Sequence, residues 1–143
     1  MIQIKEIKAK DTYTIRKAVL RKNMTLSHEM PGDHDPDSLH LGVYDDEQLL
    51  CVGSFMMASR NDLGGKQCQL RGMATSETAQ GKGYGKLLLE KAEGLLKNKG
   101  IDLIWCNARV AALDFYKRSG YQVMGDVFEV PQVGPHFVMF KSL

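Results

Sequence analysis

The chain has 143 residues, of which 43% are hydrophobic and 25% charged, and these proportions are those of an ordinary globular domain rather than a disordered chain. A net charge of +2 and a pI near 8.4 are too small to predict nucleic acid or an anionic membrane as the main partner. No run of about 18 apolar residues occurs, so neither a signal peptide nor a membrane span is predicted.

The first half of the chain predicts a strand, a helix and three antiparallel strands. Isoleucine alternates with polar residues near the N-terminus, and apolar side chains then recur at helical spacing from Thr12 to Met24. Three apolar runs follow, separated by two turns; they are His40–Tyr44, Gln48–Met57 and Gln67–Thr75. Adjacent strands joined by short turns predict an antiparallel meander.

A polar loop rich in helix breakers, Pro31–Ser38, connects the predicted helix to these strands. Its acids Asp33, Asp35 and Asp37 have two interpretations. They form a solvated connector, which is the usual state of loop acids, or they attract a cationic amine at the border of a cleft.

The second half predicts a long helix between two strands that must pair in parallel. The helix follows the stretch Gln80–Lys86, has one apolar face, and ends with cationic residues before Gly100. A buried strand at Ile101–Cys106, a short helix at Ala111–Arg118 and a final strand pair complete the order β-α-β-β-β-α-β-α-β-β. We therefore predict an α/β fold with a mixed sheet, in a single domain over residues 1–143.

The cysteines Cys51, Cys68 and Cys106 are odd in number, widely spaced and set in apolar runs. Free thiols at such positions behave as small hydrophobic side chains, so a reducing, cytoplasmic location is expected. The histidines lack the short spacing of zinc ligands, and we predict no metal.

The stretch Gln80–Lys86 holds three glycines in five residues directly before a helix, which is typical of a loop that turns main-chain N–H groups toward an anion such as a phosphate. An ATP-binding P-loop is disfavoured because Leu87 occupies the position of the magnesium-binding hydroxyl. A dinucleotide-binding motif is disfavoured because Lys86 replaces its last glycine.

The same stretch resembles the acetyl-CoA signature R/Q-x-x-G-x-G/A of the GNAT N-acetyltransferase superfamily, through Gln80, Gly83 and Gly85. Residues 111–121 resemble a second block of that superfamily, A-x-x-F-Y-x-x-x-G-F/Y, so the resemblance covers nearly the whole chain. The acidic loop, the Asn107-Ala108-Arg109 run and the Pro135-His136 ending are similar to the small ElaA-like branch.

The resemblance implies a GNAT fold in which two parallel strands splay apart and acetyl-CoA binds between them. Met73, Ala74 and Thr75 would bind its pantetheine arm, chiefly through main-chain groups. The loop would seat its diphosphate, with the lysines adding screened charge. The remaining cofactor-binding residues implied by the family are Gln80, Gly81, Lys82, Gly83, Tyr84, Gly85, Lys86, Asn107, Arg109, Phe115 and Tyr116.

Tyr116 is the predicted catalytic residue, because a phenol with a pKa of about 10 is protonated at neutral pH and can protonate a leaving thiolate. Arg109 stands where the superfamily most often has Asn, so it reaches either a phosphate or the acceptor. For the general base, Glu129, His136 and His40 are candidates beside an ordered water relay.

The predicted function is acetyl transfer from acetyl-CoA to an amine in a ternary complex. The acceptor is a polyamine, an amino acid, an aminoglycoside or a peptide terminus, and the sequence does not choose among them. A homodimer is expected only because members of the superfamily are often dimers. Two other classes remain: a CoA or acyl-CoA sensor without turnover, and an interaction domain built on an edge strand. Tyr116 favours the enzyme, because a binding module needs no acid for a thiolate.

Overall fold

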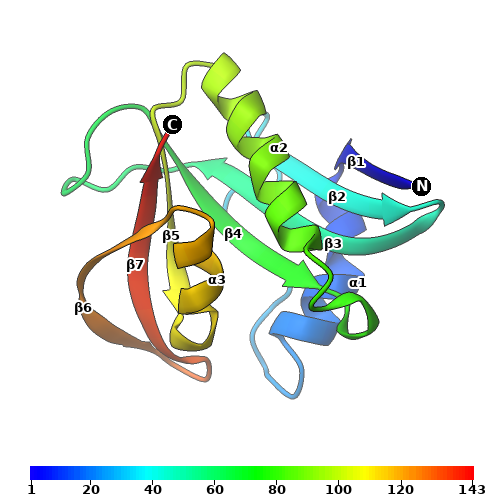
Figure 1. The fold of residues 1–143 in the computed structure, drawn as a ribbon. Coiled ribbons are helices and arrows are strands. Elements are labelled where there is room, and N and C mark those ends of the chain that lie inside the picture. Colours follow the sequence, from blue (N-terminus) through cyan, green and yellow to red (C-terminus); the bar gives the residue numbers. More distant parts are fainter.

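The computed structural model describes residues 1–143 and contains one seven-stranded sheet in the order β1-β2-β3-β4-β5-β7-β6 (Figure 1). Neighbouring strands are antiparallel except β4 and β5, which are parallel. The predicted mixed sheet is therefore confirmed. The strands are β1 (Ile2–Ile7), β2 (Leu39–Asp45), β3 (Gln48–Met57), β4 (Gln67–Thr75), β5 (Leu103–Arg109), β6 (Gln122–Val130) and β7 (Gly134–Ser142).

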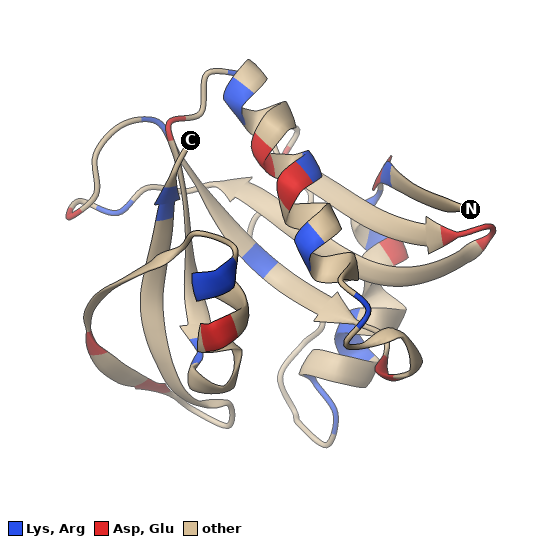
Figure 2. Ribbon diagram, viewed as in Figure 1, with Lys and Arg blue, Asp and Glu red and all other residues tan.

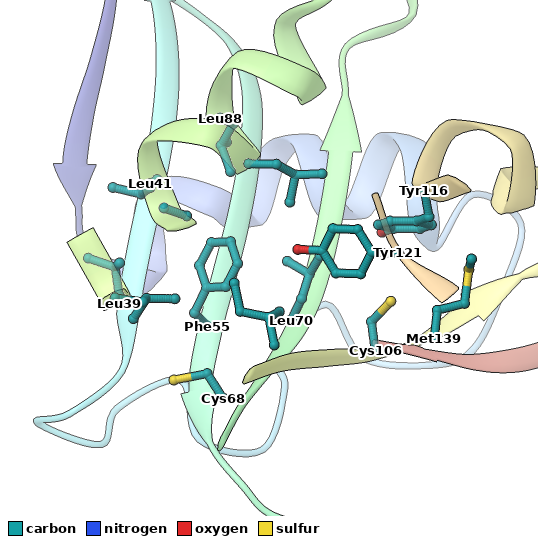
Figure 3. Packing of buried hydrophobic residues seen from close by; sticks show 14 of the residues in the cluster. Leu39, Leu41, Phe55, Cys68, Leu70, Leu88, Cys106, Tyr116, Tyr121 and Met139 are labelled. Atoms are coloured by element: carbon teal, nitrogen blue, oxygen red, sulfur yellow. The ribbon is translucent and has the colours of Figure 1, made fainter. Parts of the chain in front are cut away.

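Two helices, α2 (Tyr84–Asn98) and α3 (Leu113–Arg118), cover the face of the sheet turned toward the viewer in Figure 1. Both were predicted, and α3 is preceded by a short 3-10 turn, η4 (Val110–Ala112). The main core lies beneath them, where leucines of α2 and strand residues such as Phe55 and Leu70 meet (Figure 3). No helix combines the length and hydrophobicity that a membrane crossing requires.

The predicted regular helix from Thr12 to Met24 is wrong in both extent and regularity. The segment consists of η1 (Ala9–Thr12), α1 (Tyr13–Ile15) and a π-helical turn, η2 (Arg16–Leu20), on the opposite face of the sheet. It begins early because the Asp11 carboxylate accepts the Lys8 N–H at 3.0 Å and caps the first turn. It ends at Leu20 because the chain then turns, with Asn23 in the left-handed region.

A β-bulge bends β4 at the point where it leaves β5. Between paired residues, β3 has only Gly53 where β4 has Gly72 and Met73, and Gly72 adopts a φ of 64°. Pairing of β4 with β5 stops at Leu70–Cys106, just before the bulge, because a bulged strand bends and twists away. The C-terminal ends of the two strands therefore diverge (Figure 1).

Candidate active site

The divergence of β4 and β5 leaves two cavities that share a wall. The glycine-loop cavity, about 570 Å³, lies between α2, α3 and the end of β4, and residues of the 79–86 loop line it. The arginine cavity, about 300 Å³, is lined by Arg21, Arg71 and Arg109 together with the β6–β7 hairpin. Met73, Ala112 and Tyr116 line both cavities. Molecules in the two cavities would therefore meet at these residues.

The loop before α2 presents unpaired main-chain donors to the glycine-loop cavity. Gly81 and Gly83 have φ values of 79° and 83°, which side-chain-bearing residues rarely adopt. The N–H groups of residues 81–86 donate to no acceptor in the protein, and no side chain caps α2. Free donors at the positive end of a 15-residue helix fit an anionic group such as a diphosphate.

Most of the predicted cofactor residues lie around the glycine-loop cavity. The predicted residues that line it are Met73, Ala74, Thr75, Gln80, Gly81, Gly83, Tyr84, Gly85, Lys86, Phe115 and Tyr116. The side chain of Gln80 donates to the Thr75 carbonyl at 3.0 Å, so it closes the loop and occupies that carbonyl. Lys82 lines neither cavity, whereas Asn107 and Arg109 line the arginine cavity instead.

Tyr116 stands between the cavities with only 6% of its surface exposed. Its ring packs edge-to-face against Phe115 and Tyr121, at interplanar angles of 70° and 67° and centroid distances of 5.0 and 5.6 Å, and Figure 3 shows it beside Tyr121. Burial raises the pKa of the Tyr116 phenol well above its ordinary value, and the cationic Arg109 opposes this shift. The side chain is thus held rigidly in its protonated form.

Of the three histidine and glutamate candidates for a general base, only His136 lines a cavity. His136 is buried, and its Nδ1 lies 2.8 Å from the Gly134 carbonyl, which can only accept. In the neutral ring Nδ1 therefore carries the proton and Nε2, which has no partner in the protein, is an acceptor. Glu129 is exposed and lines neither cavity. Both ring nitrogens of His40 are occupied, by Ser54 and by the Asp33 carbonyl.

Asp33 corrects the interpretation of the acidic loop, because it is neither solvated nor free to attract an amine. Its carboxylate accepts two hydrogen bonds from the fully buried Arg16, at 2.7 and 2.9 Å. The Met30 N–H adds a third at 2.9 Å. Arg16 also donates to Ser54 and packs against the bulge at Gly72, where a Cβ would lie 2.8 Å from its Nε. This pair therefore fixes the loop beside the arginine cavity.

Sequence reasoning missed Arg16, Arg21 and Arg71. Arg16 had a detectable signal: it lies on the same helical face as Thr12 and Ile15, which are also buried, so its charge required a partner. Arg71 is the one charged residue in an otherwise uncharged strand. Arg21 carried no signal, because it follows the last helical residue and reaches the cavity only through tertiary structure.

Known proteins resemble this chain in sequence and in fold. The family model described as the acetyltransferase (GNAT) family matches residues 3–121. The uncharacterised N-acetyltransferase YitI of Bacillus subtilis (strain 168) is 36% identical over 145 residues, which span 100% of this chain and 97% of YitI. Escherichia coli ElaA superposes with a TM-score of 0.81 at 19% identity, covering 99% of each chain. A coenzyme A complex of aminoglycoside 6'-N-acetyltransferase has a TM-score of 0.78 at 13% identity, covering 98% of this chain and 96% of that enzyme.

Proposed function

The chain belongs to the acetyltransferase (GNAT) family, and from that premise we propose that it transfers the acetyl group of acetyl-CoA directly to a primary amine. The observation that carries the proposal is the shared wall of the two cavities at Met73, Ala112 and Tyr116. A donor in one cavity and an acceptor in the other react there without a covalent enzyme intermediate. Direct transfer in a ternary complex is the simplest chemistry for this arrangement.

The residues around the glycine-loop cavity fit the donor. The free N–H groups of residues 81–86 match the diphosphate, because donors at a helix N-terminus bind anions without a metal. Beyond Leu70 the β5-facing edge of β4 has no partner strand, so its main-chain groups, apart from the Thr75 carbonyl that Gln80 occupies, are available to the amides of pantetheine. The aminoglycoside 6'-N-acetyltransferase that has a similar fold forms a complex with coenzyme A, which supports a donor of this class.

Two side chains have the proton chemistry that transfer requires. As the amine nitrogen bonds to the acetyl carbon and the carbon–sulfur bond breaks, the amine proton passes to His136 Nε2 and the leaving thiolate takes the Tyr116 proton. Burial acts on both partners of the second transfer, because it raises the pKa of thiols as well as phenols. The buried Cys106 illustrates this, since desolvation raises its pKa to about 12.

The test measures free thiol release from acetyl-CoA across a panel of primary amines, with the acetylated product identified by mass spectrometry. We expect stoichiometric thiol and N-acetyl product with at least one amine. If the chain binds acetyl-CoA but releases no thiol with any amine of the panel, it is instead a CoA or acyl-CoA sensor.

Gly85→Val should raise the dissociation constant of CoA about tenfold or more. A Cβ at Gly85 would lie 3.0 Å from Phe115 and 3.3 Å from Met73, so a branched side chain overfills the glycine-loop cavity. Overpacking of this kind costs about 1–3 kcal/mol. Calorimetry with CoA measures the effect. Gly94→Val in the same helix is the control, because a Cβ there meets open space; an equal loss in both variants would contradict the proposed site.

The pH profile of kcat should show no falling limb between about pH 7 and pH 10. The pKa of Tyr116 is raised by burial, so the acid keeps its proton throughout this range, while a rise in pH only makes more of the amine acceptor neutral. Steady-state kinetics at saturating substrates measure the profile. An alkaline limb with an apparent pKa below 10 would show that the essential acid is a different group.

A further inference from the structure

Within the proposed function, we infer that the acceptor is a small amine that also carries a carboxylate or a phosphate, which Arg21, Arg71 and Arg109 hold in the arginine cavity. The charge of this cavity is one-sided, because three guanidinium groups line it and no Asp or Glu does. The strands β4 and β5, which form its centre, carry no acidic residue along their lengths (Figure 2). An anion is the complement of such a cavity.

The three guanidinium groups retain donors that the protein does not use. Arg71 is half-buried, and its guanidinium group donates no hydrogen bond within the chain. Arg109 uses Nη2 on the Leu20 carbonyl at 3.0 Å and keeps Nε and Nη1 free. Arg21 uses Nε and Nη1 on main-chain carbonyls and keeps Nη2 free. Guanidinium groups with free planar donors bind carboxylates and phosphates through paired hydrogen bonds.

The protein surroundings of the three guanidinium groups disfavour their charged forms. Burial lowers the pKa of Arg21, and the neighbouring charges of Arg109 and Arg16 lower it further. Burial likewise lowers the pKa of Arg71 and Arg109. The groups stay protonated because an arginine pKa exceeds about 12 in water. The one carboxylate whose charge raises the pKa of Arg71 is that of Asp33, and it is already bound to Arg16. An anionic ligand would therefore supply the missing counter-charge.

This charge disfavours two acceptor classes that the sequence left open, polyamines and aminoglycosides. Both are polycations, and a second ammonium group would face three guanidinium groups in a half-buried setting. The cavity volume of about 300 Å³ lies at the small end of ligand pockets, which suits a metabolite of a few heavy atoms. A small amine with one anionic group satisfies both the charge and the size.

The test compares amines that carry an anionic group with similar amines that lack one. O-phosphoethanolamine is paired with ethanolamine, β-alanine with propylamine, and putrescine is the dication. Thiol release gives kcat/KM for each, and calorimetry in the presence of CoA gives the affinity of each without turnover. We expect the better anionic amine to exceed its neutral partner about tenfold to a hundredfold in both measurements, which is the usual effect of a charged hydrogen bond. If O-phosphoethanolamine is the better acceptor, the cavity binds a phosphate; if β-alanine is better, it binds a carboxylate.

Arg71→Gln should lower the ratio between the anionic amine and its neutral partner about tenfold or more, through KM, and leave CoA affinity unchanged. Lys97→Gln removes the same charge from the exposed face of α2 and should leave the ratio unchanged. The inference would be overturned if putrescine were used or bound as well as the anionic amine, or better. It would also be overturned if Arg71→Gln left the ratio between the anionic amine and its neutral partner unchanged. If no amine turns over but anionic amines bind in an Arg71-dependent way, the charge selectivity stands and the proposed function falls.

Discussion

Tyr116→Phe should lower kcat about a hundredfold or more while changing the dissociation constant of CoA less than threefold. Loss of a positioned general acid removes about 10²–10⁴-fold of rate. Tyr116 is 6% exposed and lines both cavities, which is the position that the proposed acid for the leaving sulfur requires. The ring contacts with Phe115 and Tyr121 do not involve the hydroxyl, so removal of one oxygen leaves the packing intact.

Tyr121→Phe is the matched control, because it removes the hydroxyl of a neighbouring buried tyrosine that lines neither cavity. That hydroxyl donates to Glu93 at 3.3 Å, so its loss affects stability slightly and not the chemical step. Single-turnover kinetics isolate the chemical step for both variants. A full single-turnover rate in Tyr116→Phe would refute the acid role, and equal losses in both variants would indicate a general effect of the aromatic cluster.

The glycine loop and α2 were predictable because their signals are local. Glycines that permit positive φ, an apolar helix face and the terminal Gly100 lie within about 20 residues of one another, and each indicates the same loop-to-helix transition. The parallel pairing of β4 with β5 followed from the helical crossover between them. By contrast, the insertion of β7 between β5 and β6 depends on tertiary pairing that no local pattern encodes.

The acceptor side of the site was not predictable to the same degree. Its residues come from the chain after η2, from the bulge in β4, and from the β6–β7 hairpin, and they meet only because β4 and β5 diverge. The bulge itself depends on Gly72 in a left-handed conformation against the buried Arg16. Since a lone glycine in a strand pattern is also compatible with a regular strand, the sequence alone does not locate the bend.

Asp33→Asn should lower the free energy of unfolding at pH 7 by about 3–5 kcal/mol, because it leaves the charge of Arg16 buried without a counter-ion. Both side chains of the pair are at most 1% exposed. Burial opposes ionisation of Asp33, but hydrogen bonds from Arg16 and the Met30 N–H outweigh it and lower its pKa. The stabilisation is therefore complete above about pH 4, the ordinary range of aspartate, and is lost as the pH falls through the lowered folded value.

Urea unfolding of both proteins at pH 7 and at acid pH measures this difference, and Asp37→Asn in the same loop is the control. Asp37 is exposed and unpaired, so its substitution should change stability by less than about 0.5 kcal/mol. A loss below about 1 kcal/mol in Asp33→Asn at pH 7, or an equal loss in acid, would contradict the account of a buried ionised pair.

Asp33→Asn should also affect the arginine cavity and the glycine-loop cavity to different degrees. The Arg16–Asp33 pair joins η2 to the loop at Met30, and Met30 and the residues after η2 border the arginine cavity. The glycine-loop cavity is lined mainly by the 79–86 loop, α2 and α3, and Val19 is its one lining residue from η2. Under denaturant-free, folded conditions Asp33→Asn should therefore raise the KM of the acceptor more than it raises the dissociation constant of CoA. Parallel loss of both affinities would mean that the pair stabilises the whole domain without positioning the acceptor cavity.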